Sequence, residues 1–357
     1  MNSEPRWPDG LAGLALFCRD LEASAAYPQG MEADGLESTE MDPLWIGLDV
    51  GGSGGRALSA ARLGGRWSVS SAPLEFLWDD DFRPVPLREQ LAYPGELTAQ
   101  EEVCGSRRVR LLADCVLELA AERAFKLGVC VPGLQTSDGR GVKAWRNGPR
   151  RLTFLRDLER SIRASGGEII DVPSSLCPDS IACALGELRS EQGILYESAN
   201  ALCISGGSGV GEAVIVEGSC HALDELDPPL PRAWELSGGG GQSLEDRVAP
   251  GLLMAAWQGA GRAGAPEEHD GEDAALLLDT QDAGLSSLIE RARGWFSARG
   301  LELERVGLCQ ALGRIYASAP QRLDLIRDRF ASIEILTSDF RGAPALGAVI
   351  AAEERAS

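Results

Sequence analysis

The stretch LWIGLDVGGSGGRALSAARL, residues 44–63, decides the fold. An apolar run ends in Asp49, four glycines stand among residues 51–55, and a second apolar run follows. This order predicts a β-hairpin with a glycine-rich turn. Since a turn needs only one or two glycines, a further role is expected. Backbone N–H groups in such a turn form a concave anion site, and glycine permits close approach and positive φ. The segment alone equally permits a plain hairpin loop.

Two other phosphate-binding motifs do not fit this segment. A Rossmann motif needs G-x-G-x-x-G followed by a long helix, but Gly64 and Gly65 interrupt any helix here. A Walker loop ends in Gly-Lys-Ser or Gly-Lys-Thr, which the sequence lacks. The hairpin interpretation therefore stands, and Asp49 is placed at the strand end to hold a hydrated Mg²⁺ that accompanies ATP.

A second stretch, SGGSGVGEA at residues 205–213, repeats the same design between two apolar runs. One glycine cluster in a hairpin is common. Two such hairpins, each followed by helix and strand, predict an α/β protein of two similar halves. We expect the two turns to face each other across a cleft and hold one polyphosphate.

Composition limits the functional classes. A chain of 357 residues favours two domains. The net charge of −20 argues against nucleic acid and against an anionic membrane surface as partners. The nine cysteines are odd in number and scattered, which favours reduced thiols in the cytoplasm over disulfides.

The chain divides into an extension and two domains. Residues 1–43 are rich in Pro, Gly, Ser and acidic residues, and we expect them to be disordered. The expected first domain covers 44–146 and is completed by a C-terminal helix over 343–354. The expected second domain covers 147–342. A long helix is predicted from about residue 98 to 126.

Asp179 begins the predicted helix PDSIACALGELRS, residues 178–190. Asp is a favoured N-cap residue, so a structural role is one interpretation. The other is a general base that removes a proton from a hydroxyl as it attacks a γ-phosphoryl group. A helix N-terminus keeps a carboxylate ionised, as a base requires.

Together these segments resemble the ROK (repressor, open reading frame, kinase) family of sugar kinases and the related bacterial glucokinases. GLDVGGSGGRAL resembles the family's first phosphate motif, PDSIACALGE its catalytic segment, GGSGVGEAVIVEG its second phosphate motif and APALGAVIAA its terminal helix. The resemblance runs over residues 44–354 and implies a two-domain RNase H-like, actin-like ATPase fold with an active-site cleft between the domains.

The resemblance also implies roles for individual residues. Asp179 matches the catalytic base, and Asn147, Glu245 and Glu225 are the candidate sugar contacts. Asp49 would bind Mg²⁺ through water. The residues implied in binding nucleotide phosphates are Asp49, Gly51, Gly52, Ser53 and Gly54 in the first turn and Gly207, Ser208, Gly209 and Gly211 in the second.

The sequence departs from the family's pattern at several places. Pro178 replaces the asparagine before the base, and the histidine of the sugar clamp near Glu225 has no counterpart. LSGGGGQS replaces the zinc-binding cysteines, so no structural zinc is expected. Of the Gly-Gly turn against adenine, only Gly307 and Gly313 are present nearby.

The leading hypothesis is an ATP- and Mg²⁺-dependent kinase that phosphorylates a hydroxyl of a hexose or related sugar, with Asp179 as base. Family members are commonly dimers or tetramers, so a homodimer is compatible with it. One alternative is a catalytically degenerate ROK-like protein that binds nucleotide or sugar as a sensor or scaffold. Another is an ATPase of the same fold that drives a partner enzyme through a cysteine-bound iron–sulfur cluster.

Overall fold

The computed structural model describes residues 43–79, 81–93 and 95–356, so the expectation of disorder for 1–43 lies almost wholly outside the described residues. The described chain forms two compact units. The first unit comprises residues 43–197 and 340–356, and the second comprises residues 198–339. This division differs from the predicted boundary at 146/147, because residues 147–197 pack with the first turn's unit. Within these ranges, no helix is both long and apolar enough to cross a bilayer.

The first unit is a sheet covered by helices. Its strands lie in the order β3-β2-β1-β5-β8, with β4 paired to β2 and β9 paired to β5. β1 is antiparallel to β2 and parallel to β5. The elements are β1 (Leu44–Val50), β2 (Gly54–Leu63), β3 (Arg66–Val69), β4 (Leu74–Leu77), α2 (Leu87–Ala92), α3 (Ala99–Ala120), β5 (Phe125–Val131), β6 (Leu134–Gln135), β7 (Val142–Ala144), α4 (Phe154–Ala164), β8 (Ile169–Asp171), β9 (Cys177–Pro178), α5 (Asp179–Arg189) and α11 (Ala343–Ala356).

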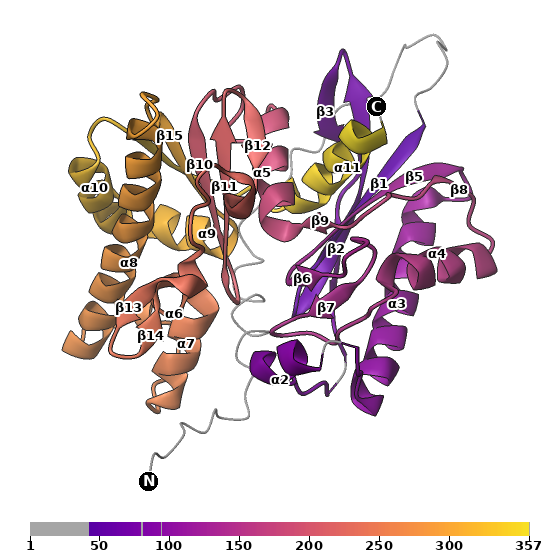
Figure 1. Ribbon diagram of the computed structural model, residues 1–357, viewed down its shortest axis with the longest axis horizontal. Helices are drawn as coiled ribbons and strands as arrows, with labels where there is room; N and C mark the ends of the chain where they lie inside the picture. The colour runs from indigo at the N-terminus through magenta and orange to yellow at the C-terminus, as the bar shows by residue number, and fades with distance from the viewer. Residues whose placement is uncertain (1–42, 80, 94, 357) are drawn as a thin grey trace. The chain divides into compact units, whose positions relative to one another are not determined.

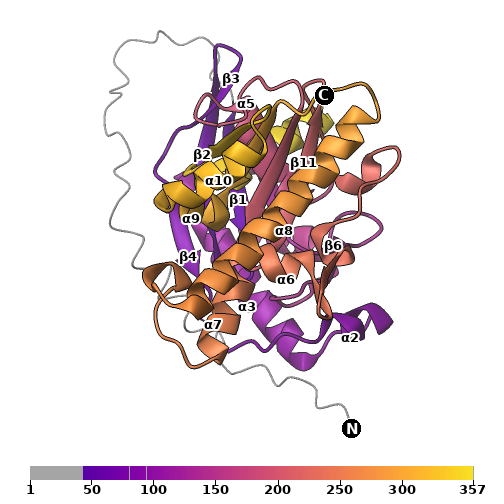
Figure 2. The same cartoon turned by 90° about the vertical axis from the view of Figure 1, so that its left-hand side faces the viewer.

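The second unit repeats this topology. Its main sheet has the order β12-β11-β10-β15-β16, again an antiparallel hairpin that continues into parallel strands. Figure 2 shows the long helix α8 beside β11, and both contribute to one apolar core. The elements are β10 (Ala201–Gly206), β11 (Val210–Val216), β12 (Ser219–His221), η2 (Leu223–Glu225), η3 (Ala233–Glu235), β13 (Ser237–Gly239), β14 (Gln242–Ser243), α6 (Leu244–Val248), α7 (Pro250–Gly259), η4 (Pro266–Glu268), α8 (Glu272–Ser297), β15 (Arg305–Cys309), α9 (Gln310–Ser318), α10 (Pro320–Arg329) and β16 (Glu334–Thr337).

The α/β prediction and its two similar halves are confirmed by the matching strand orders. The predicted helix over 98–126 is too long, since α3 ends at Ala120 and β5 begins at Phe125. Ala121 and Glu122 end the helix because both adopt positive φ, at 46° and 66°. Neither is a glycine, so the sequence carries no stop signal there.

Helix α11 lies directly against β1, β5 and α5, as Figure 1 shows for the yellow helix. Each contact uses a glycine: Gly47 on β1, Gly128 on β5 and Gly186 on α5 face backbone atoms of α11, and Gly347 on α11 faces α5. A Cβ at any of these positions would lie under 3.0 Å from a backbone carbonyl. The backbones therefore touch with no side chain between them.

We expect Gly347→Ala to lower the free energy of unfolding by about 3 kcal/mol, because its Cβ would overlap the carbonyl of Ala182 on α5. Gly294→Ala on α8 is the matched control, since a Cβ there meets nothing within 4 Å. That control should raise stability by up to about 1 kcal/mol. Urea unfolding of both variants checks this, and equal effects would contradict the close contact.

A buried ion pair anchors the start of α3. Glu101 is fully buried and accepts two hydrogen bonds from the guanidinium of Arg150, at 2.6 and 2.9 Å. Its carboxylate also accepts the Thr98 N–H of the capping box, at 2.8 Å. Burial disfavours the charged carboxylate, but the Arg150 and Thr98 hydrogen bonds outweigh it and hold the pKa of Glu101 below its ordinary value.

We predict that Glu101→Gln costs about 3–5 kcal/mol at pH 7, since it leaves Arg150 buried without its carboxylate. A lowered folded pKa means that the ion pair stabilises fully above the ordinary value of 4.5 and is lost as pH falls through the folded pKa. The difference between wild type and variant should therefore shrink below about pH 4.5 in denaturant titrations. Glu102→Gln, at an exposed partner of Arg151, should cost less than about 1 kcal/mol. A stability difference between wild type and Glu101→Gln that does not change with pH would contradict the ion pair.

Candidate active site

The first turn is tight and uses its glycines for close approach. The N–H of Gly51 donates to the carbonyl of Gly54 at 2.7 Å. A Cβ at Gly54 would meet β4 within 3.0 Å, and one at Gly52 would lie 2.9 Å from the Cβ of Asn147. No glycine among residues 51–55 has positive φ. The expected positive φ is therefore wrong for this turn, and contact with neighbouring backbone explains its glycines.

Two backbone donors of this turn are available to a ligand. Within the described part of the chain, the N–H groups of Gly52 and Ser53 donate to no protein acceptor. Asn147 lies against Gly52 from the loop after β7, and its amide side chain likewise makes no hydrogen bond to the described protein. The structure thus brings the predicted sugar contact Asn147 to the first predicted phosphate turn.

Asp49 lies at the end of β1 between two neighbouring strands. It pairs in register with Arg56 on β2 and with Cys130 on β5. Its Oδ2 is 3.7 Å from the Arg56 guanidinium, and its Oδ1 is 3.7 Å from the Cys130 thiol. Burial raises the pKa of Asp49, and the Arg56 charge and the Cys130 hydrogen bond only partly oppose this.

Asp179 is the first residue of α5, directly after the short strand β9. Its Oδ1 accepts the N–H of Ser180 at 2.9 Å, while Pro178 holds the N-cap position. Asp179 thus stands at the helix N-terminus, where the helix dipole favours an ionised carboxylate.

The thiol of Cys130 contacts Asp49 and lies on β5, beside the strand β9 that leads to Asp179. Burial raises its pKa well above the ordinary value, and the negative charges of Asp49 and Asp179 add to that effect. β9 pairs with β5 at Cys130 and Cys177, which carries the chain from β9 to Asp179 on the adjacent helix. Asp49 and Asp179 therefore lie near one neutral thiol. Sequence reasoning missed Cys130, because its position depends on parallel pairing of distant strands.

The second turn is closed in a similar way. Gly207 N–H donates to the Gly209 carbonyl at 2.9 Å, and Gly251 N–H donates to the Gly207 carbonyl at 2.8 Å. The N–H groups of Ser208 and Gly209 donate to no acceptor among the described residues. Gly211 continues into β11, where its carbonyl accepts the Ser205 hydroxyl at 3.2 Å.

Glu245 supports this second turn from α6. Only 8% of the residue is exposed, and its Oε1 accepts the Val210 N–H at 3.1 Å. Glu225, in contrast, is exposed and accepts the Ala222 N–H of its own 3₁₀ turn at 3.0 Å. The two glutamates predicted to contact sugar thus have different surroundings, one at the second turn and one in a local cap.

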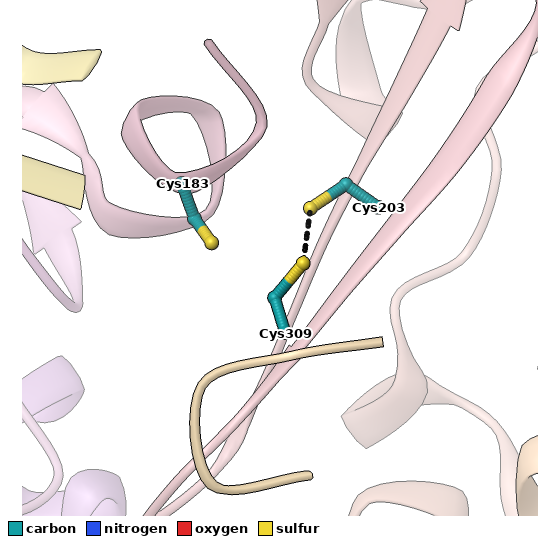
Figure 3. A group of neighbouring side chains, drawn as sticks. All are labelled: Cys183, Cys203 and Cys309. Atoms are coloured by element: carbon teal, nitrogen blue, oxygen red, sulfur yellow. Dashed lines mark hydrogen bonds between the residues drawn. The ribbon is translucent and has the colours of Figure 1, made fainter. Parts of the chain in front are cut away.

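The glycine-rich segment over residues 236–243 forms its own hairpin. β13 and β14 are joined by Gly239, Gly240 and Gly241, all with positive φ. The described cysteines are free thiols. Figure 3 shows Cys203 and Cys309 of the second unit pointing toward each other, with their sulfurs 3.7 Å apart.

Gln310 lies beside the second turn, and its position was not predicted from the sequence. It follows β15, bridges to Gly206 at the start of the second turn, and has a φ of 61°. The sequence analysis considered Gly307 and Gly313 for a turn here, but neither has positive φ. A glutamine in the left-handed region is a strained choice. No sequence signal marks it, because glycine is the residue expected there.

Gly209→Ala should lower the free energy of unfolding by about 1–3 kcal/mol, because its Cβ would lie 2.7 Å from Oε1 of Glu245. Gly207→Ala in the same turn is the control, since its Cβ meets nothing within 4 Å. In a Glu245→Ala background the cost of Gly209→Ala should largely disappear. Thermal unfolding of the four proteins measures this, and an undiminished cost in that background would show that Glu245 is not the obstacle.

Comparison with known proteins gives structural matches only. No protein-family model matches the sequence, and no curated protein matches it. The ROK hexokinase from Thermus thermophilus superposes with a TM-score of 0.55 at 17% identity, covering 88% of this chain and 99% of that one. A ROK-family glucokinase from Streptomyces griseus, solved with glucose and AMPPNP, gives 0.54 at 16% identity, covering 87% and 99%.

The same fold also occurs in a regulator. A ROK-family transcriptional regulator, a homologue of the E. coli MLC protein, matches with a TM-score of 0.52 at 12% identity, covering 87% of this chain and 78% of that one. Such identities establish architecture and leave chemistry to be argued from the residues. The chain therefore has the two-domain, actin-like α/β fold of the ROK-family sugar kinases and glucokinases.

Proposed function

We propose that this protein is an ATP-dependent carbohydrate kinase that transfers the γ-phosphoryl group to a hydroxyl of a hexose or related sugar. One observation carries the proposal. The first unit alone holds Asp49 near the end of β1, the open amides of the first turn beside Asn147, and Asp179 at the start of α5, next to the strand β9 that pairs with β5. We assign them as an acidic metal ligand, anion donors, a polar orienting group and a base, the parts that phosphoryl transfer requires.

The residues present fit a nucleotide phosphate and Mg²⁺. The open N–H groups of Gly52 and Ser53 suit phosphate oxygens. Asp49 offers one carboxylate, and Mg²⁺ is commonly held by one or two carboxylates together with water and phosphate. When bound, Mg²⁺ neutralises charge on the phosphates. The protein's own part is to hold Asp49 in place through Arg56 and Cys130.

Asp179 is proposed as the general base. It would accept the proton of the attacking sugar hydroxyl, and the Ser180 N–H fixes one of its oxygens at 2.9 Å. Asn147 would orient the sugar by hydrogen bonds from its uncommitted amide.

Within the second unit, the amides of Ser208 and Gly209 and the carboxylate of Glu245 are proposed as ligand contacts. A carboxylate at that turn opposes a bound anion, so we assign Glu245 to sugar hydroxyls and assign the phosphates chiefly to the first turn. Gly207 and Gly211 shape the second turn. The proposal does not depend on Glu225, whose carboxylate caps its own turn.

A sensor without kinase activity is the second candidate. Pro178 removes a side-chain amide directly before the base, and a transcriptional regulator shares the fold. In both candidate functions the protein binds a small ligand. Its free thiols favour a reducing, cytoplasmic location.

A coupled ADP-release assay with Mg²⁺ and ATP, run over hexoses, amino sugars and polyols, tests the kinase. We expect sugar-dependent turnover, and Asp179→Asn should lower kcat by about a thousandfold because the base is lost. Asp171→Asn, at an exposed position on β8, should leave kcat unchanged.

No turnover on any acceptor, with a sugar still raising the melting temperature, would replace the kinase with the sensor. Turnover that survives Asp179→Asn would remove that residue from the mechanism.

A further inference from the structure

Three successive carbonyls of the first turn each accept a hydrogen bond from Trp78 or Arg108. The Gly51 carbonyl accepts the indole N–H of Trp78 at 2.9 Å. The Gly52 carbonyl accepts Nη1 of Arg108 at 3.4 Å. The Ser53 carbonyl accepts the backbone N–H of Trp78 at 3.1 Å. Two residues distant in sequence, one after β4 and one on α3, therefore set the orientation of these three peptide groups.

Fixing a carbonyl also fixes the amide that follows it. A trans peptide is planar, so the N–H of the next residue points opposite to the carbonyl. Carbonyls of Gly51 and Gly52 held toward Trp78 and Arg108 turn the N–H groups of Gly52 and Ser53 the other way. Those are the two amides that have no acceptor in the described protein.

Arg108 is itself held firmly in place. Only 5% of the residue is exposed, and its guanidinium lies 4.7 Å from the centre of the Trp78 ring and 5.5 Å from that of Phe82. Such contacts stabilise a cation on an aromatic face. The two rings thereby hold the guanidinium where its Nη1 donates to the Gly52 carbonyl.

We propose that Trp78 and Arg108 are positioning residues that preset the first turn as an oxyanion-binding site for the phosphates of a nucleotide. This inference rests on the proposed function for the identity of the ligand. The residues act through the turn's backbone, so they determine the affinity for phosphate and contribute nothing to recognition of the base or the sugar. Donors that are already oriented bind phosphate more tightly, because less conformational freedom is lost on binding.

Calorimetric titration with ATP, inorganic tripolyphosphate and adenosine tests this on the full chain. Trp78→Phe keeps a ring for Arg108 and the backbone donor but loses the indole N–H, and Arg108→Met loses the charge. We expect each to weaken ATP and tripolyphosphate binding about five- to tenfold, as for one lost hydrogen bond or more, and to leave adenosine unchanged. Arg107→Met, at the exposed neighbour that pairs with Asp79, should change none of the three.

Different results test the role of Trp78 and Arg108 and the proposed kinase activity separately. Equal affinity of wild type and both variants for tripolyphosphate would overturn the inference, as would equal weakening of all three ligands, which signals a general loss of structure. Weaker tripolyphosphate binding in the variants, without sugar phosphorylation by wild type, would support the inference and contradict the kinase. Failure of wild type to bind ATP or tripolyphosphate would overturn both.

Discussion

The first unit depends on direct backbone contact between α11 and its neighbours β1, β5 and α5. Glycine at each contact removes the side chain that would separate the backbones, and a Cβ there would overlap a carbonyl. This contact holds α5 against α11, and Asp179 is the first residue of α5. It also places the carbonyl of Pro344 3.5 Å from the Cys130 thiol, between α11 and β5. The position of the proposed base is therefore set by helix packing together with the pairing of β9 with β5.

The two glycine turns share a topology but differ in charge. The first has Arg108 on its closed side and two amides open on the other. The second has the carboxylate of Glu245 hydrogen-bonded beside it. A cation behind a turn favours an anionic ligand, and a carboxylate beside it opposes one. The similar motifs in the sequence thus have different charged neighbours, and we propose that phosphate binds chiefly at the first turn.

Much of this architecture can be predicted from the sequence. Two apolar runs around each glycine cluster predict the hairpins, and both hairpins are present as β1–β2 and β10–β11. Asp179 is correctly expected at a helix start because helix α5 has a clear apolar periodicity after it. Each of these features depends on residues close together in the sequence, so a local sequence pattern can predict it.

The parts that could not be predicted depend on contacts between distant segments. Trp78 and Arg108 reach the first turn only because β4 pairs with β2 and α3 packs beside it. Gln310 adopts positive φ where glycine would be expected, and α3 ends at a left-handed alanine. Two reasons were expected for the first turn's glycines. Close approach of neighbouring backbone is correct, and positive φ is wrong.

The central claim is that the amides of Gly52 and Ser53 bind phosphate. The most direct measurement follows the amide resonances of these two residues in isotope-labelled protein as Mg²⁺ and ATP are added. The account predicts large shifts of both resonances and none with adenosine, because hydrogen bonds to phosphate oxygens form at these N–H groups. Unmoved resonances at Gly52 and Ser53 while ATP shifts others elsewhere would contradict it.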